Sequence, residues 1–204
     1  MNLTRRHFIG SSAVAVTVAG MKAQGVVLGS NNRIRVCTVG FNGQGSSHIK
    51  DILGTLKADA EYVALCDVDA NVRAKGAKLV TDAQGKAPKL YADMREAFQQ
   101  KDIDVVTIAT PNHWHSLAAV WAMQAGKDVY VEKPMSHNIY EGQQVAAAAK
   151  KYNRVVQHGT QSRSNATLIR DMKLIHSGFI GKIIESRGYV YKNGNRGSIG
   201  RGKP

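Results

Sequence analysis

The sequence IRVCTVGFNGQG at residues 34–45 decides the fold class of this chain. Its first half is rich in β-branched and apolar residues, which is typical of a buried strand, and the glycines of its second half permit a tight turn. The residues that follow carry Ile49, Ile52, Leu53 and Leu56 at the spacing of one helical face. A strand, a glycine-rich turn and a helix in this order indicate the start of a βαβ unit.

Short apolar strands and helices continue to alternate along the chain. The strand expected at residues 104–109 is the most apolar, so we place it at the centre of the sheet. Among the helices, one is expected to be capped by Asp93, one to end at Gly126 and one to cover 138–151. Six strands separated by helices predict an α/β fold with a Rossmann-type, doubly wound parallel sheet. The five strands expected after the first are 61–66, 89–91, 104–109, 128–131 and 154–157.

The pattern changes in the last quarter of the chain. A helix is expected over residues 166–176 and a further strand over 182–191. One helix and one strand cannot bury a core of their own. We therefore interpret residues 31–158 as one domain and 159–204 as the beginning of a second α/β domain that is cut short.

Length and composition limit the class of protein. The 204 residues, at 22.1 kDa, suffice for one Rossmann-sized domain and the beginning of another. A hydrophobic content of 43% with 21% charged residues excludes a disordered chain, a coiled coil and a collagen. Cys37 and Cys66 lie 29 positions apart with no CxxC pair, so we expect neither a disulfide scaffold nor a metal site.

The net charge of +13 is unevenly distributed. Residues 1–150 carry 17 basic and 13 acidic side chains, whereas residues 151–204 carry 11 basic and 2 acidic ones. The stretch 187–204 has five cations and no carboxylate, a composition that could bind nucleic-acid phosphates. Because no nucleic-acid-binding module precedes it, we expect no nucleic-acid partner. The alternative is that this stretch packs against acidic residues further along a longer chain.

The N-terminus has the pattern of an export signal. TRRHFIG at residues 4–10 contains a twin-arginine pair, and an apolar run over 11–21 follows before Lys22. Only 15 residues separate Arg6 from Lys22, fewer than the roughly 20 that a transmembrane helix needs. We therefore expect residues 1–30 to be a Tat signal peptide, and the mature protein to be periplasmic or secreted with no membrane anchor. The alternative is a fraying N-terminal helix.

The turn at residues 40–45 has the position of a dinucleotide-binding loop. Glycines there let backbone N–H groups and the start of the next helix approach a pyrophosphate. In the pattern G-x-G-x-x-G the middle glycine is replaced by Asn42, a residue type that tolerates a left-handed backbone, and a glycine follows directly. A plain strand-to-helix turn would explain the same residues. The candidate cofactor-binding residues of this turn are Gly40, Asn42, Gly43, Gln44 and Gly45.

Asp67 ends the expected second strand, 22 residues after Gly45. An acidic side chain at this point accepts hydrogen bonds from the adenosine ribose and repels a 2′-phosphate, which favours NAD over NADP. A helix cap is the alternative, and Asp69 could fill that role as well.

Two motifs follow the expected fourth and fifth strands: TPNHWH at residues 110–115 and EKP at 132–134. Ligands of open α/β sheets bind at the carboxyl ends of the strands, where both motifs lie. Beside a nicotinamide, Lys133 could act as an acid, a base or a hydroxyl-orienting donor. Of the two histidines we expect His115 to face the cleft, although a lone histidine is more often a cap or a packed ring.

Together these motifs resemble those of the Gfo/Idh/MocA oxidoreductases over about residues 31–190. The resemblance rests on the glycine turn, Asp67, TPNHWH, GKDVYVEKP at 126–134 and GTQSR at 159–163. It implies an N-terminal nucleotide-binding domain and a C-terminal α/β domain whose large open sheet commonly mediates association into homo-oligomers. It also implies hydride transfer between NAD, or NADP, and a sugar, polyol or related alcohol. Several exported members of the family carry Tat leaders.

The resemblance further implies roles for single residues. Lys133 corresponds to the catalytic lysine of the family, and Glu132 to a residue near the nicotinamide ribose. The family's second catalytic group lies in the C-terminal domain, and this chain offers no match for it: Asp171 and His176 are five apart on one helix and do not share a face. The residues implied for the pocket wall are Thr110, Pro111, Asn112 and His115.

Three functions remain open from the sequence. The first is an NAD(P)-dependent oxidoreductase acting on a carbohydrate or polyol, in which Lys133 helps to manage the hydroxyl proton. The second is a redox-neutral glycosidase in which bound NAD oxidises a sugar transiently and assists elimination at the glycosidic bond. The third is an inactive nucleotide-binding fragment. The intact EKP lysine favours the first.

Overall fold

The structure is a computed structural model that describes residues 33–189. The chain divides into two compact units, Met1–Ser164 and Asn165–Pro204, a division that lies a few residues beyond the boundary predicted after residue 158. The predicted signal peptide and the last part of the basic stretch lie outside the described residues.

The first unit is built on a six-stranded, fully parallel sheet with the order β3-β2-β1-β4-β5-β6. β4 lies at the centre beside β1, as its apolar sequence predicts. The strand order reverses between β1 and β4, and this reversal is the signature of a doubly wound sheet. The predicted fold class is therefore confirmed. The strands are β1 Ile34–Val39, β2 Ala60–Cys66, β3 Lys89–Tyr91, β4 Val105–Ile108, β5 Asp128–Glu132 and β6 Val156–Gly159.

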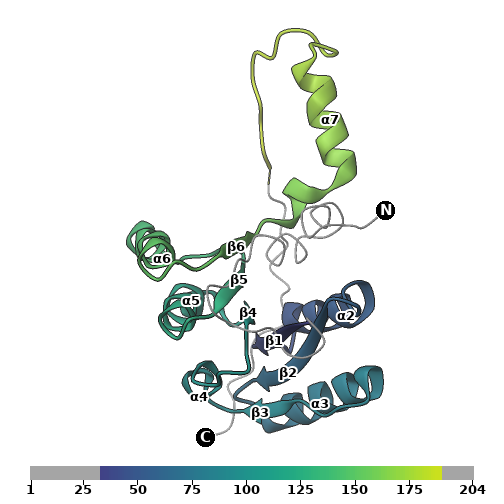
Figure 1. Cartoon of the computed structure of the whole chain (residues 1–204). Coiled ribbons are helices and arrows are strands. Elements are labelled where there is room, and N and C mark those ends of the chain that lie inside the picture. Colours follow the sequence, from purple (N-terminus) through teal and green to yellow (C-terminus); the bar gives the residue numbers. More distant parts are fainter. Residues whose placement is uncertain (1–32, 190–204) are drawn as a thin grey trace, which may run out of the picture. The chain divides into compact units, whose positions relative to one another are not determined.

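Helices cover both faces of this sheet, with α2 and α3 on one side and α4, α5 and α6 on the other (Figure 1). Each side has its own hydrophobic core. Ile49, Ile52 and Leu65 belong to the core under α2 and α3, whereas Val106 and Met123 belong to the other. The helices are α2 Gln44–Thr55, α3 Ala70–Gln84, α4 Met94–Phe98, α5 His115–Gln124 and α6 Ile139–Lys151, with short 3₁₀ turns η2 Asn112–Trp114 and η3 Gln161–Ser164.

Side-chain caps fix the starts of four of the described helices, α3, α4, α6 and α7 (Ala166–His176). The Asp69 carboxylate accepts the backbone N–H groups of Asn71 and Val72 at the start of α3, and Asp93 caps α4 as its sequence position predicts. Asp69 therefore takes the capping role that was one of the two alternatives for Asp67. The end of α5 also follows the prediction, because Gly126 adopts a φ of 78° just beyond it.

β6 lies two residues later than predicted. It pairs with β5 from Val156 onward, so the expected strand residues Arg154 and Val155 precede it. Arg154 donates to the carbonyl of Gly126, and the backbone N–H of Val155 donates to the carboxylate of Asp128. Arg154 and Val155, which the apolar pattern predicts to lie within this strand, make these contacts instead.

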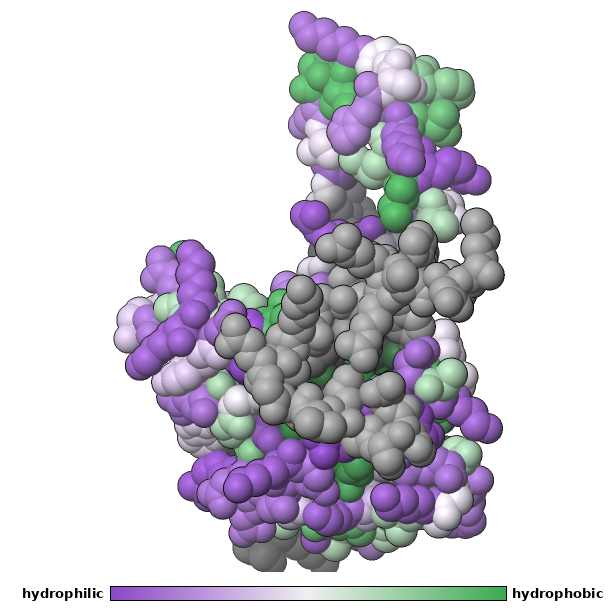
Figure 2. Space-filling model, viewed as in Figure 1, coloured by the Kyte–Doolittle hydropathy of each residue, from purple (hydrophilic) through white to green (hydrophobic). Residues whose placement is uncertain are grey.

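The second unit contains α7, Ala166–His176, with the predicted bounds. The strand predicted over 182–191 is wrong for residues 182–189, which have no regular secondary structure and are exposed. A strand needs the N–H and C=O groups of a neighbour, and the described part of this unit contains no other strand. Its surface includes exposed hydrophobic residues, among them Phe179 and Ile184. Figure 2 shows green, hydrophobic patches on this unit. Within residues 33–189 no helix is both long and apolar enough to cross a membrane.

Candidate functional site

The register of the sheet brings the ends of four strands to one edge. Val39 on β1 pairs with Cys66 on β2 and with Ile108 on β4, and Ile108 pairs with Val131 on β5. The residues that follow these four along the chain are Gly40, Asp67, Ala109 and Glu132. The glycine turn, the acidic residue and the TPNHWH and EKP motifs therefore begin side by side at the carboxyl edge, as the sequence predicts.

Two glycines of the turn are required by close packing. Gly40 has a φ of 75°, and a Cβ added to it would lie 2.9 Å from the Cα of Thr110. A Cβ on Gly45 would lie 2.1 Å from the carbonyl oxygen of Gly40. Side chains at these positions would push the turn away from β4 and α2 away from the turn.

The turn also leaves room for an anion. A Cβ on Gly43 would meet no atom of the described residues within 4 Å. Gly43 is the N-cap of α2, which has no side-chain cap and no acidic residue in its first turn. The positive end of the helix dipole therefore faces open space, an arrangement that suits a pyrophosphate. Asn42 and Gln44 are exposed beside it. Asn42 does not use a left-handed backbone, since among the described non-glycine residues Asn153 alone has a positive φ.

Asp67, which directly follows β2, is hydrogen-bonded to the glycine turn that follows β1. One carboxylate oxygen accepts the backbone N–H of Phe41 at 2.9 Å, and the other accepts the N–H of Asp69 at 3.0 Å. Each carboxylate oxygen has a second lone pair, so the group can still accept a hydroxyl hydrogen bond. The bond to Phe41 joins residues 26 positions apart, and local sequence patterns gave no signal for it.

Lys133 lies exposed just beyond β5, whereas the Glu132 side chain before it is buried. Glu132 accepts the backbone N–H of Lys133 on Oε2, and on Oε1 it accepts from Gln161 at 2.6 Å and from His48 Nε2 at 2.9 Å. Burial raises the pKa of the Glu132 carboxyl, but the hydrogen bonds from His48, Gln161 and the Lys133 amide outweigh it and hold the pKa below its usual value. Glu132 is thus an ionised group held by the protein itself. Sequence reasoning gave no signal for His48, and it included Gln161 only within the GTQSR motif, without a role.

His115 is a packed ring, which contradicts the expectation that it faces the cleft. It is 1% exposed, its Nδ1 lies 2.6 Å from the carbonyl of Pro134, and its Nε2 lies 2.8 Å from that of Thr110. The first turn of α5 places the ring between these two chain segments, so both nitrogens meet backbone carbonyls. His115 therefore ties the end of β4 to the segment after Lys133, and its contact with a cofactor stays a prediction.

The pocket-wall residues predicted from TPNHWH lie at the start of η2. Pro111 and Asn112 are exposed, and the Thr110 hydroxyl is buried without a hydrogen-bond partner. In residues 33–189, His48 Nδ1 is the other buried side-chain atom in this state. An unpaired buried hydroxyl at the edge of the sheet fits a site that is completed by a ligand. The open turn and this hydroxyl are both compatible with a bound dinucleotide.

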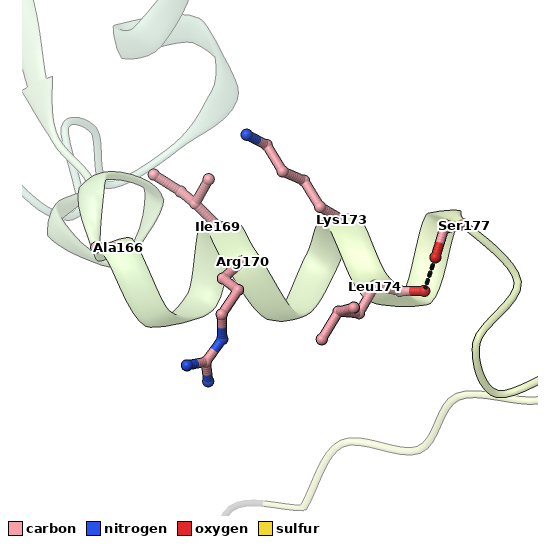
Figure 3. Close-up of a pocket in the computed structure, with 6 residues that line it drawn as sticks. All are labelled: Ala166, Ile169, Arg170, Lys173, Leu174 and Ser177. Carbon is pink, nitrogen blue, oxygen red and sulfur yellow. Dashed lines mark hydrogen bonds between the residues drawn. The ribbon is translucent and has the colours of Figure 1, made fainter.

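The described part of the second unit, residues 165–189, offers no comparable chemistry. Figure 3 shows a groove along α7 in which the Ser177 hydroxyl donates to the carbonyl of Leu174 at 2.8 Å. Asp171 on the same helix pairs with Arg170 rather than with His176. The described part of the chain contains no group of acidic, histidine and cysteine side chains that could hold a metal ion. The groove is lined by Ala166, Ile169, Arg170, Lys173, Leu174 and Ser177.

Comparison with known proteins agrees with this geometry. Residues 34–160 match the Gfo/Idh/MocA family, described as an oxidoreductase family with an NAD-binding Rossmann fold. A glycosyl hydrolase family 109 protein of Shewanella pealeana is 27% identical over 220 residues, which cover 94% of this chain and 47% of that protein. An inositol 2-dehydrogenase of Salmonella typhimurium is 33% identical over 154 residues, 75% of this chain and 44% of that protein.

A solved structure shows the same likeness. The myo-inositol 2-dehydrogenase of Lactobacillus plantarum superposes with a TM-score of 0.65 at 25% identity, over 74% of this chain and 43% of that one. This chain therefore spans less than half the length of each of the three relatives.

Proposed function

Because this chain belongs to the Gfo/Idh/MocA oxidoreductase family and contains its NAD-binding Rossmann domain, we propose that the protein is an NAD-dependent oxidoreductase acting on a CH–OH group of a polyol or sugar. The observation that carries the proposal is the carboxyl edge of the sheet, where an open glycine turn, Asp67 and an exposed Lys133 directly follow β1, β2 and β5. These strands belong to the paired order β2-β1-β4-β5. The inositol dehydrogenases among the relatives support the choice of a polyol.

Each residue of this edge has a distinct task in the proposed reaction. When bound, the nicotinamide ring supplies the hydride acceptor or donor. The turn and the start of α2 hold the pyrophosphate, and Asp67 accepts from the adenosine ribose. Oxidation of an alcohol releases a hydroxyl proton together with the hydride, and Lys133 takes this proton or, in the reverse direction, returns it.

The glycosyl hydrolase family 109 relative, which matches 94% of this chain, supports a second candidate function, that of a glycosidase. A redox-neutral glycosidase would use the same turn, Asp67 and Lys133, and would regenerate its NAD in every cycle. Assays with an aryl glycoside and with inositol separate the two functions, since the glycosidase releases aglycone with no net change in NADH absorbance.

The cellular location belongs to the same proposal. The twin-arginine pair and the apolar run of residues 4–21 support export by the Tat pathway to the periplasm or beyond. Tat export of a folded protein suits an enzyme that carries its nucleotide across the membrane. A fusion of residues 1–30 to a reporter, with Arg5 and Arg6 replaced by Lys as the control, tests this directly.

Replacement of Lys133 tests the catalytic assignment. In a chain that turns over, Lys133→Ala should lower kcat by about a hundredfold or more, the range for loss of a general acid or base, and NADH affinity measured by calorimetry should stay within about threefold of wild type. Lys150→Ala, an exposed lysine on α6, is the matched control. Loss of NADH binding with unchanged chemistry would contradict the role of Lys133.

A further inference from the structure

A polar network joins three elements next to Lys133, with two of its side chains, His48 and Glu132, buried and the third, Gln161, exposed. His48 comes from α2, Glu132 from the end of β5 and Gln161 from η3. His48 is 2% exposed and Glu132 4% exposed, and the carboxylate receives both side chains on the same oxygen. The His48 ring also stands perpendicular to the ring of Tyr130, with centroids 5.2 Å apart.

The Glu132 carboxylate couples its partners because it is a buried charge. An ionised group out of water needs several hydrogen-bond donors, and the loss of one forces the others to rearrange. Its donors are the His48 ring, the Gln161 amide and the backbone N–H of Lys133. The position of the Lys133 backbone therefore depends on the two side chains that hold the carboxylate.

His48 links this carboxylate to the nucleotide-binding turn. It lies one helical turn after Gln44, where α2 begins, and a helix moves as a rigid element over that length. Because a carboxylate only accepts, the Nε2 atom carries the proton of the bond to Glu132. The Nδ1 atom is buried and has no partner among the described residues, so Glu132 provides the hydrogen bond that orients the ring.

We propose that His48 and Gln161 are positioning residues through which occupation of the glycine-rich turn sets the placement of Lys133. The inference rests on the proposed function, since it takes the turn to be the pyrophosphate site. It assigns no contact with substrate or cofactor to either residue. Their role is to transmit the position of α2 to the EKP backbone.

Hydrogen exchange at the Lys133 amide measures this transmission, because that N–H donates to Glu132. The probe is ADP, which supplies the adenosine and the pyrophosphate but lacks the nicotinamide half that would touch Lys133 directly. Saturating ADP should slow exchange of the Lys133 amide in the wild-type chain by about fivefold or more, the usual lower range of coupling between two sites. NADH, titrated by calorimetry, reports separately whether the turn binds the dinucleotide.

Four variants distinguish positioning from simple support of the fold. His48→Ala should abolish the effect of ADP on Lys133, whereas His48→Gln should keep it, because a glutamine amide can donate to Glu132. Gln161→Ala should weaken the effect of ADP. Because Gln161 is exposed, this variant should fold, so it still tests the inference if His48→Ala does not fold. Ile52→Val, a buried change on the same helix, is the control that lowers stability and keeps the coupling.

The outcomes separate this inference from the proposed function. If wild type binds ADP and NADH but its Lys133 amide exchanges at an unchanged rate, the inference is overturned and the proposed function stands. The inference also fails if both His48→Ala and Gln161→Ala respond to ADP as wild type does. If wild type binds neither ADP nor NADH, the proposed function is overturned, and the inference that rests on it falls with it.

Discussion

Asp67 accepts the backbone N–H of Phe41, and we propose that the same side chain also accepts from the adenosine ribose. Asp67→Asn keeps an acceptor for the Phe41 N–H but removes the charge. We expect NADH affinity to fall by about tenfold or more, because a hydrogen bond to a charged group contributes ~1.5–3 kcal/mol, and the preference for NADH over NADPH to shrink. Calorimetry with both nucleotides measures this. Asp69→Asn, which keeps the α3 cap, should leave the preference unchanged, and an equal change there would refute the assignment.

Glu132 makes the stability of the fold depend on pH in the acid range. Its pKa in the folded protein lies below the usual 4.5, so the ionised carboxylate stabilises the fold above that pH, and the contribution is lost as the pH falls through the folded pKa. Urea unfolding of wild type should therefore show stability dropping below about pH 4.5. Glu132→Gln should be less stable at pH 7 and show a shallower drop in acid. Glu96→Gln, at an exposed position, should follow wild type; identical acid profiles for Glu132→Gln and wild type would contradict this.

Single residues also show where sequence reasoning reaches its limit. Asp67 and Lys133 could be predicted because each follows a recognisable strand, and strand ends meet at one edge of a parallel sheet. His48 and Glu132 are 84 positions apart, and their contact depends on how α2 crosses the sheet, which no local pattern encodes. His115 was placed in the cleft because its motif lies there, but packing turned its ring toward the backbone.

At the scale of elements, helix caps make a measurable contribution to the stability of the helices that cover the sheet. Asp69 accepts two backbone N–H groups at the start of α3. Asp69→Ala should lower the free energy of unfolding by about 1 kcal/mol, the usual cost of losing an N-cap. Urea unfolding detects this loss, with Asp82→Ala on the exposed side of α3 as the control. Equal stability of Asp69→Ala and wild type would show that α3 starts without help from this side chain.

Elements were predictable where a segment carries its own signal. β1, β3 and α7 have the bounds that their apolar runs and caps indicate. β6 is displaced because pairing with β5, rather than its own composition, selects the residues that enter the sheet. The strand expected at 182–191 is absent from its described residues, 182–189, because pairing requires a neighbour, and a sequence pattern cannot supply one.

At the scale of the whole molecule, both hydrophobic cores belong to the first unit. Every residue of the two core clusters lies between Ile34 and Val156. In contrast α7 buries no side chain, and the second unit exposes several large apolar residues. Exposed apolar surface of this kind promotes association. The exposed apolar residues are Leu168, Ile169, Met172, Leu174, Phe179, Ile180, Ile183 and Ile184.

A chain ending at Ser164 should therefore keep the fold and the nucleotide site. Because neither core loses a residue, its thermal midpoint should stay within about 4 °C of the full chain, a shift equivalent to less than 1 kcal/mol, and its NADH affinity should be unchanged. Light scattering should show less association, since the exposed apolar residues are gone. A chain ending at Lys151 is the matched control: it also lacks β6 and Gln161, and it should lose both stability and the hold on Glu132. If the chain ending at Ser164 unfolds or no longer binds NADH, the second unit contributes to the site in a way that these cores do not explain.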